Sequence, residues 1–135
     1  MTRLSQLVSF TVLAAATLAG AAPAKRQIGE THAGDATFYA TGLGACGIVN
    51  NDRDHIVAVS GLLYDSYPGT TPNSYPICGK QMTVTYQGRS TTVTVADRCA
   101  VDACAMNDIV LSPVAFTDLS PLDAGRIRVT WVWDD

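Results

Sequence analysis

Two neighbouring segments of alternating residues constrain the fold of this chain more than any other feature. Residues 81–86 (QMTVTY) alternate polar and apolar side chains, and residues 89–96 (RSTTVTVA) carry β-branched residues on both faces. The Gln-Gly dipeptide at 87–88 between them is typical of a turn. Because one face of each segment can enter a core, the pattern predicts a β-hairpin rich in β-branched residues.

The rest of the chain predicts more strands and two short helices. Residues 127–133 (IRVTWVW) alternate in the same way, and we expect Trp131 and Trp133 to pack in the core. Further strands are expected at residues 35–40 and 55–59, helices at 60–64 and, after Ser112-Pro113, at 114–119, and a loop at 67–76. Strands that each bury one face favour a mainly β domain, folded as a closed barrel or a sandwich.

The first residues of the chain are typical of an export signal. Arg3 precedes a short apolar stretch at residues 7–18, and residues 19–21 (AGA) are the small residues that a signal peptidase requires. A membrane span needs about 20 apolar residues, so this stretch is short for one. We therefore expect residues 1–21 to be a signal peptide of a secreted, extracellular protein, with a buried N-terminal helix as the alternative.

A dibasic pair follows the expected signal peptide. Lys25-Arg26 resembles the processing sites of the fungal secretory pathway, with an ordinary basic pair in a flexible tail as the alternative. We expect residues 22–26 to be a short pro-segment, residues 27–33 a flexible tail and residues 34–135 the folded domain. Removing three basic residues and no acid would take the formal net charge from −3 to −6.

The charge and the motifs exclude several classes of partner and cofactor. An acidic domain without a cluster of lysines and arginines offers no binding surface for nucleic acid or for an anionic membrane. The sequence contains neither a phosphate-binding glycine loop nor a nucleophile elbow, and His32, in the expected tail, and His55 stand in no catalytic motif. We therefore expect no cofactor and a monomeric domain.

Four cysteines, at positions 46, 78, 99 and 104, are an even number in a small exported domain. They are expected to form two disulfides, for which three pairings exist. We favour Cys46–Cys78 and Cys99–Cys104, whose loops are worth roughly 4 and 2 kcal/mol of stability. No metal site is expected, because a zinc site would need closer spacing between the cysteines.

Carboxylates are the best candidates for chemistry. Asp97 ends the apolar run at 93–96 and stands two residues before Cys99, so a disulfide can hold it rigidly at the end of a strand. Burial there would suit it to general-acid use, but the spacing alone favours a loop aspartate that caps backbone N–H groups. The same two interpretations apply to Asp108, near the start of a strand that precedes Ser112.

Six short motifs resemble those of the double-psi β-barrel family. They are Gly34 to Tyr39 (GDATFY), Gly44 to Gly47 (GACG), Cys78 to Lys80 (CGK), Val95 to Cys99 (VADRC), Leu111 to Phe116 (LSPVAF) and Gly125 to Ile127 (GRI). Within this family the chain resembles fungal single-domain proteins of the rare lipoprotein A-like, expansin-like and loosenin type, with barwin, plant expansins and family-45 endoglucanases as more distant kin. The resemblance implies a six-stranded barrel with a shallow groove that holds glycan in expansin-like members.

The resemblance also implies which residues line that groove. Thr37 and Asp97 match its threonine and its strand-end aspartate, and Tyr39 is a plausible aromatic neighbour. The aspartate that usually precedes Leu-Ser-Pro is replaced by Val110, and Asp108, about 7 Å away along a strand, is a partial substitute. Because glycoside hydrolysis normally needs two carboxylates, we expect no catalytic residues and no enzymatic activity.

Three functions follow from this resemblance, in order of preference. The first is binding and loosening of a cell-wall polysaccharide, cellulose or chitin, without hydrolysis. The second is a protein-binding module, such as a cysteine-protease inhibitor or a host-directed effector, with the tyrosine-rich loop from Tyr64 to Tyr75 as its surface. The third is a true hydrolase or lytic transglycosylase.

Overall fold

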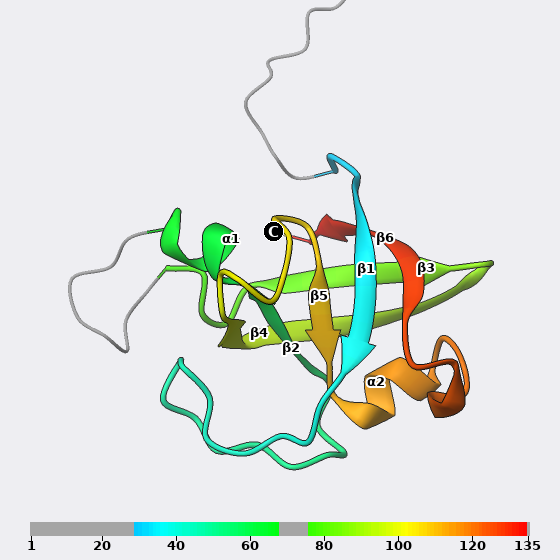
Figure 1. Cartoon of the computed structure of the whole chain (residues 1–135), viewed down its shortest axis with the longest axis horizontal. Helices are drawn as coiled ribbons and strands as arrows, with labels where there is room; N and C mark the ends of the chain where they lie inside the picture. The colour runs from blue at the N-terminus through cyan, green and yellow to red at the C-terminus, as the bar shows by residue number, and fades with distance from the viewer. Residues whose placement is uncertain (1–28, 68–75, 135) are drawn as a thin grey trace, which may run out of the picture.

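Six strands form a closed barrel in a computed structural model, which describes residues 29–67 and 76–134. The strands are β1 (His32–Phe38), β2 (Ile56–Ser60), β3 (Gln81–Tyr86), β4 (Arg89–Cys99), β5 (Ile109–Leu111) and β6 (Ile127–Trp133). Two α-helices, α1 (Gly61–Asp65) and α2 (Pro113–Thr117), and a 3₁₀ helix, η1 (Leu122–Ala124), connect them. The six-stranded β-barrel with short helices that the sequence predicts is confirmed (Figure 1).

The order of strands around the barrel is β1-β5-β2-β4-β3-β6. The pairs β1–β5 and β2–β4 are parallel, and the other pairs are antiparallel. Because the strand order closes on itself, none of the six strands in the described part of the chain is an edge strand. None of the helices in the described part of the chain is both long and apolar enough to cross a membrane. The expected signal peptide and dibasic site lie outside the described residues.

The predicted hairpin is β3 and β4. Gln87 and Gly88 both have positive φ angles, of 49° and 84°, as a two-residue turn between twisted strands requires. Met82, Val84, Val93 and Val95 are buried at 1 % exposure or less. β4 continues three residues beyond the predicted segment to Cys99, because its second half pairs with β2 after an irregularity beside Ala58.

β1 begins earlier than the sequence predicts. His32 and Ala33, which we assigned to a flexible tail, belong to the strand and pair with Trp131 and Thr130 of β6. The imidazole of His32 stacks on the indole of Trp131 with 4.2 Å between ring centroids. This contact covers the ring of Trp131, which is 1 % exposed, and it extends the strand beyond the expected start at Asp35.

The two predicted helices are present, and their first residues are held differently. Ser60 Oγ accepts a hydrogen bond from Leu63 N (3.0 Å) and donates one to Met106 O (2.8 Å), so it caps α1 and binds the loop before β5. Ser112 Oγ does not cap α2; it accepts from Ile56 N of β2 (3.3 Å). Both disulfides have the favoured pairing, Cys46–Cys78 and Cys99–Cys104.

Candidate functional site

One register row crosses four strands on the outside of the barrel. Thr37 of β1 pairs with Val110 of β5, Val110 pairs with Ala58 of β2, and Ala58 pairs with Asp97 of β4. We call these four residues the Asp97 row. With strands about 4.8 Å apart, the row spans roughly 14 Å from Thr37 to Asp97. The structure therefore brings these two sequence-predicted residues to one row, although 60 positions separate them.

The carboxylate of Asp97 is fixed by three hydrogen bonds. Its Oδ1 atom accepts from the backbone N–H of Ala45 and of Arg98, both at 2.8 Å, and its Oδ2 atom accepts from the hydroxyl of Tyr39 at 3.3 Å. The side chain is only partly buried. A carboxylate can accept about four hydrogen bonds, so Asp97 retains acceptor capacity for a ligand hydroxyl or amide.

Tyr39 follows β1 and serves as the donor to this carboxylate. Burial raises the pKa of its phenol well above the ordinary value, and the charge of Asp97 and the hydrogen bond between them raise it further. The phenol is therefore protonated at neutral pH and donates to Asp97. The side chain of Tyr39 is partly buried and its hydroxyl is bound to Asp97, so the ring borders the Asp97 row and is not an open stacking platform.

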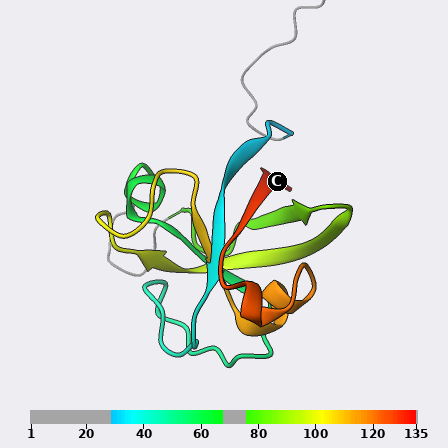
Figure 2. The ribbon, with the colours of Figure 1, turned by 45° about the vertical axis from the view of Figure 1, so that its right-hand side comes forward.

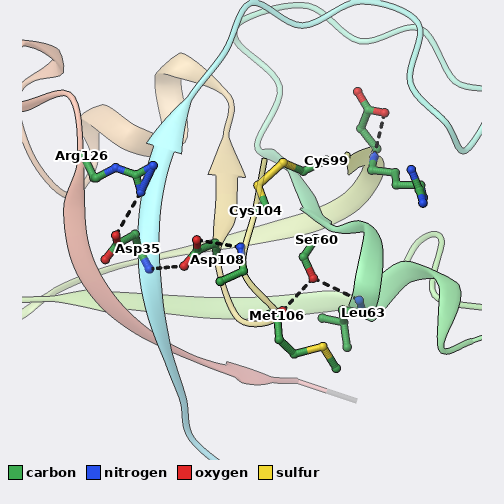
Figure 3. Close-up of a disulfide and its surroundings, with 11 residues drawn as sticks. Asp35, Ser60, Leu63, Cys99, Cys104, Met106, Asp108 and Arg126 are labelled. Atoms are coloured by element: carbon green, nitrogen blue, oxygen red, sulfur yellow. Dashed lines mark hydrogen bonds and ion pairs between the residues drawn. A yellow bond between two sulfur atoms is a disulfide. The ribbon is translucent and has the colours of Figure 1, made fainter. Parts of the chain in front are cut away.

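Asp108 lies immediately before β5 and braces the backbone. Its Oδ1 atom accepts from Asp35 N of β1 (2.9 Å), and its Oδ2 atom accepts from Ala105 N (3.0 Å), as Figure 3 shows. One oxygen therefore holds a backbone N–H group of β1, and the other holds one on the turn that leads into β5. This is the capping arrangement, and it does not supply the Asp97 row with a second carboxylate at Val110.

Two loops with exposed apolar side chains flank Asp97, a feature that sequence reasoning missed. The 43–49 loop exposes Leu43 (73 %), Ile48 and Val49 (74 %), and the 99–106 loop exposes Val101 and Met106. Among the described residues, the other large exposed hydrophobic side chains are Leu62 on α1 and Leu122. Apolar exposure on this domain is thus concentrated around the end of β4. In Figures 1 and 2 both loops lie beside that end.

The 43–49 loop is held rigidly against β4. A bridge joins Leu43 and Val49, and Gly44 N donates to Ile48 O at 3.1 Å. Cys46 N donates to Ala96 O (3.2 Å), and the disulfide from Cys46 reaches Cys78. A Cβ atom added at Gly44 would lie 2.3 Å from Ala96 O, so only glycine allows this close approach.

The 99–106 loop lies on the other side of Asp97. The Cys99–Cys104 disulfide closes it (Figure 3). The side chain of Val101 approaches Gly61 at the start of α1. Arg98, next to Asp97, donates from Nε (3.0 Å) and Nη2 (2.7 Å) to the carboxylate of Asp65. This paired hydrogen bond fixes α1 beside the loop. Each apolar loop is therefore stapled by its own disulfide.

The remaining candidates of the sequence do not join this site. Tyr64, which we placed in a surface loop, is 2 % exposed and packs in the core, and residues 68–75 of that loop lie outside the described residues. His55 contacts Asp118 at 2.8 Å, away from Asp97. In the described ranges no group of three or more potential ligands is arranged to hold a metal ion. Trp131 and Trp133 are buried, as predicted.

Comparison with known protein families agrees with this architecture. A family model described as "Lytic transglycolase", the rare lipoprotein A-like double-psi β-barrel, matches residues 31–131. The chain belongs to this family. The double-psi β-barrel implied by the six motifs is thereby confirmed, and the disulfides fit proteins of oxidising, extracellular compartments.

Curated relatives fall into two groups. A papain inhibitor of Streptomyces mobaraensis is 36% identical over 84% of this chain and 78% of its own length. An Asp f 7 allergen homologue of Arthroderma benhamiae is 38% identical over 68% of this chain, but this stretch is only 34% of that protein. The double-psi β-barrel thus spans about a third of the fungal relative and most of the bacterial one.

Among solved structures, too, the match covers nearly all of one relative and about half of another. The Streptomyces papain inhibitor superposes with a TM-score of 0.71 and 34% identity, and the match covers 80% of this chain and 97% of that one. An expansin of Clavibacter michiganensis, solved in complex with cellohexaose, gives a TM-score of 0.61 and 31% identity over 76% of this chain and 50% of its own. The neighbours of this double-psi β-barrel fit a carbohydrate-binding or a protein-binding role.

Proposed function

We propose that this protein is a secreted protein-binding module that inhibits papain-like cysteine proteases. The observation that carries the proposal is the pair of disulfide-stapled apolar loops beside Asp97, which expose most of the large hydrophobic side chains that the described surface offers. Contiguous exposed apolar side chains on a small soluble domain are typical of protein-binding surfaces. Similarity to a papain inhibitor along nearly its whole solved chain supports the same class of partner.

The geometry suits occlusion of an active-site cleft. Papain-like proteases act through a Cys-His pair, which any tightly fitting surface can cover without chemistry. Leu43 and Val49 stand at the base of a hairpin-like loop whose backbone is already hydrogen-bonded, so that little conformational entropy is lost on binding. Asp97 holds the loop in position through Ala45 N.

The test is inhibition of papain by residues 27–135 and by a double variant, Leu43→Ser with Val49→Ser. Each apolar anchor of an interface typically contributes 1 kcal/mol or more, so we expect the inhibition constant to rise roughly tenfold to a hundredfold. Leu122→Ser is the matched control, because Leu122 is exposed (38 %) but lies on η1. Unchanged inhibition by the double variant, or none by the parent domain, would contradict the proposal.

Binding of a cell-wall polysaccharide without hydrolysis is the second candidate, and the Asp97 row favours it. Asp97 and Thr37 offer an acceptor and a hydroxyl on one outer row, and a similar expansin has been solved with cellohexaose. It ranks below protease inhibition because glycan platforms use open aromatic rings. Here Trp131 and Trp133 are buried, and Tyr39 is tied to Asp97.

The test of this second candidate is retention on insoluble cellulose and on chitin. If the row binds glycan, Asp97→Ala reduces the retained fraction several-fold, whereas Asp134→Ala, at the end of β6, leaves it unchanged. No soluble sugar is expected to be released, because Val110 occupies the position of the second carboxylate. Release of sugar by the parent domain would establish enzymatic activity and overturn this expectation.

A further inference from the structure

A pocket between the end of β3 and the first residues of β6 takes part in neither candidate function. The ladder between β3 and β6 ends at the pair Thr85–Thr130, and β6 continues in register with β1 down to Ile127. Where the strands separate, a pocket of about 490 Å³ opens, and a second of about 330 Å³ adjoins it across Tyr86 and Gln87. Pockets of roughly 300–1,000 Å³ are typical of small-ligand sites.

Three arginines line these two pockets. Arg126 and Arg128 border the larger pocket, and Arg89 borders the smaller one. They are half of the six basic residues of an otherwise acidic domain. The nearby acids are Asp35, which pairs with two of them, Asp123 on η1 and Asp118, whose carboxylate binds His55 and Thr91. The three arginines are thus matched by three nearby acids, so the pocket region is formally close to neutral, whereas the domain as a whole is acidic.

The guanidinium groups retain donors for a ligand. Arg126 and Arg128 each give one Nη1 atom to Asp35, at 3.0 and 3.3 Å, and their side chains remain 56 % and 69 % exposed. An arginine has five N–H donors, so each keeps several for a second carboxylate. Arg89 forms no ion pair or side-chain hydrogen bond with any residue in the described part of the chain.

The other lining residues are suited to a sugar. Thr85 and Thr130 provide hydroxyls, Gln87 provides an amide, and Tyr86, which packs partly against the core, provides an aromatic surface. Hydroxyl and amide groups around an aromatic ring bind the polar edges and the apolar face of a pyranose. The arginines add a site for a carboxylate, and Asp35 shows that the pair accepts one.

We propose that the pockets around Tyr86, lined by Arg89, Arg126 and Arg128, bind an acidic oligosaccharide through the carboxylates of its uronate residues. The site is distinct from Asp97. Arg89 and Asp97 are eight residues apart on β4, about 25 Å along the strand. In Figure 1 the tip of the hairpin lies at the right and the arrowhead of β4 at the left. Both sites can therefore be occupied at once, which would hold the protein on an acidic polysaccharide while its apolar loops stay free.

The experiment is a titration of residues 27–135 with oligogalacturonate, followed by amide chemical shifts and calorimetry at about 0.15 M salt. The expected result is saturable binding with shifts at residues 85–89 and 126–130. Arg89→Gln should weaken binding about tenfold, since a charge-assisted contact is lost. Arg126→Gln together with Arg128→Gln should abolish it. Arg53→Gln, an arginine in the loop before β2, is the matched control and should leave affinity unchanged.

Three comparison ligands separate the sources of binding. Neutral cello-oligosaccharide of equal length should not bind, and a sulfated glycan and inorganic phosphate should compete only at much higher concentration. Equal binding of the neutral sugar would overturn the carboxylate claim. Competition by phosphate at the same concentration would show simple anion attraction and overturn the sugar claim. Unfolding temperatures of all variants, expected to match the parent because these ion pairs are exposed, exclude loss of folding as a cause.

Discussion

The two ends of β4 are built in opposite ways. At its start, β3 and β4 meet in a two-residue turn, Gln87-Gly88, and arginines line the adjacent pockets. At its end, Asp97 lies between two irregular loops that expose aliphatic side chains and contain both disulfides. The turn at the first end is held by the backbone hydrogen bonds between β3 and β4. The loops at the second end are held by disulfides and by hydrogen bonds to the carboxylate of Asp97.

This difference indicates which segments of the domain tolerate substitutions on the surface. A tight turn fixes its few residues through φ and register, so that little can be inserted without shifting the ladder. In the 99–106 loop the disulfide joins Cys99 to Cys104, and in the 43–49 loop Cys46 anchors the middle of the loop to Cys78. Because these bonds limit the freedom of the chain, the exposed side chains beside them can change at little cost to the fold. The apolar loops are thus the part of this barrel that is best suited to partner recognition.

The largest effect is expected from removing the covalent bonds at the Asp97 end. Cys46→Ser with Cys78→Ser opens a loop with a sequence separation of 32 and should cost about 4 kcal/mol, whereas Cys99→Ser with Cys104→Ser opens one of 5 and should cost about 2 kcal/mol. Urea unfolding of both double variants measures the difference. Equal losses would mean that loop closure is not what the disulfides contribute, and the contrast between the two ends would weaken.

A glycine at each end gives the next test. Gly44→Ala should cost roughly 2–3 kcal/mol, because its Cβ would meet Ala96 O at 2.3 Å and the backbone must move. Gly88→Ala meets nothing within 4 Å, but φ is 84°, so the strain should cost only about 1 kcal/mol. Thermal unfolding gives both values. A larger loss at Gly88 would show that the turn, and not the loop contact, is the more constrained site.

The sequence predicts the hairpin end far better than the Asp97 end. Alternation in residues 81–96 records which side chains face inward, and Gln-Gly specifies the turn, so strand bounds and core follow from local pattern. Leu43 and Val49 show no period, and nothing local distinguishes an exposed aliphatic residue in a loop from a buried one. The family motifs located Asp97, but only the register of four strands shows what stands beside it.

Long-range convergence limits the prediction of both sites for the same reason. Arg89 and Arg126 are 37 positions apart, and they border adjoining pockets because β3 and β6 separate beyond Thr85–Thr130. The start of β1 at His32 likewise depends on the indole of a residue 99 positions away. Such contacts depend on which residues pair across neighbouring strands. Periodicity predicts that strands close into a barrel, but it does not predict this pairing.

Removing one aspartate from each end should have unequal effects. Asp97→Ala leaves Ala45 N, Arg98 N and the Tyr39 hydroxyl without their acceptor, at a cost of roughly 1–3 kcal/mol. Asp35→Ala removes two exposed ion pairs and should cost less than about 1 kcal/mol. Chemical unfolding measures both losses, and amide exchange at Ala45 should accelerate in the first variant alone. Similar losses in the two variants would contradict a bracing role for Asp97.

The smallest effect concerns alkaline pH and the donor to Asp97. Burial and the carboxylate raise the pKa of Tyr39 in the folded protein, whereas the unfolded chain titrates near the ordinary value of about 10. Above that pH the unfolded state therefore binds fewer protons than the folded state. It follows that stability is unaffected by this group below about pH 10 and falls as pH rises further, by less than about 1.4 kcal/mol per pH unit.

Tyr39→Phe isolates this contribution from those of the other tyrosines. At pH 8 the variant should be about 1 kcal/mol less stable than the parent, because Asp97 loses a donor. As pH rises above 10, the parent loses the additional stability and the two unfolding curves should converge. Urea unfolding at several pH values, with tyrosinate absorbance as a second signal, follows both changes. Curves that stay parallel would show that the Tyr39 phenol loses its proton at the same pH in the folded protein as in the unfolded chain, and would contradict its burial beside Asp97.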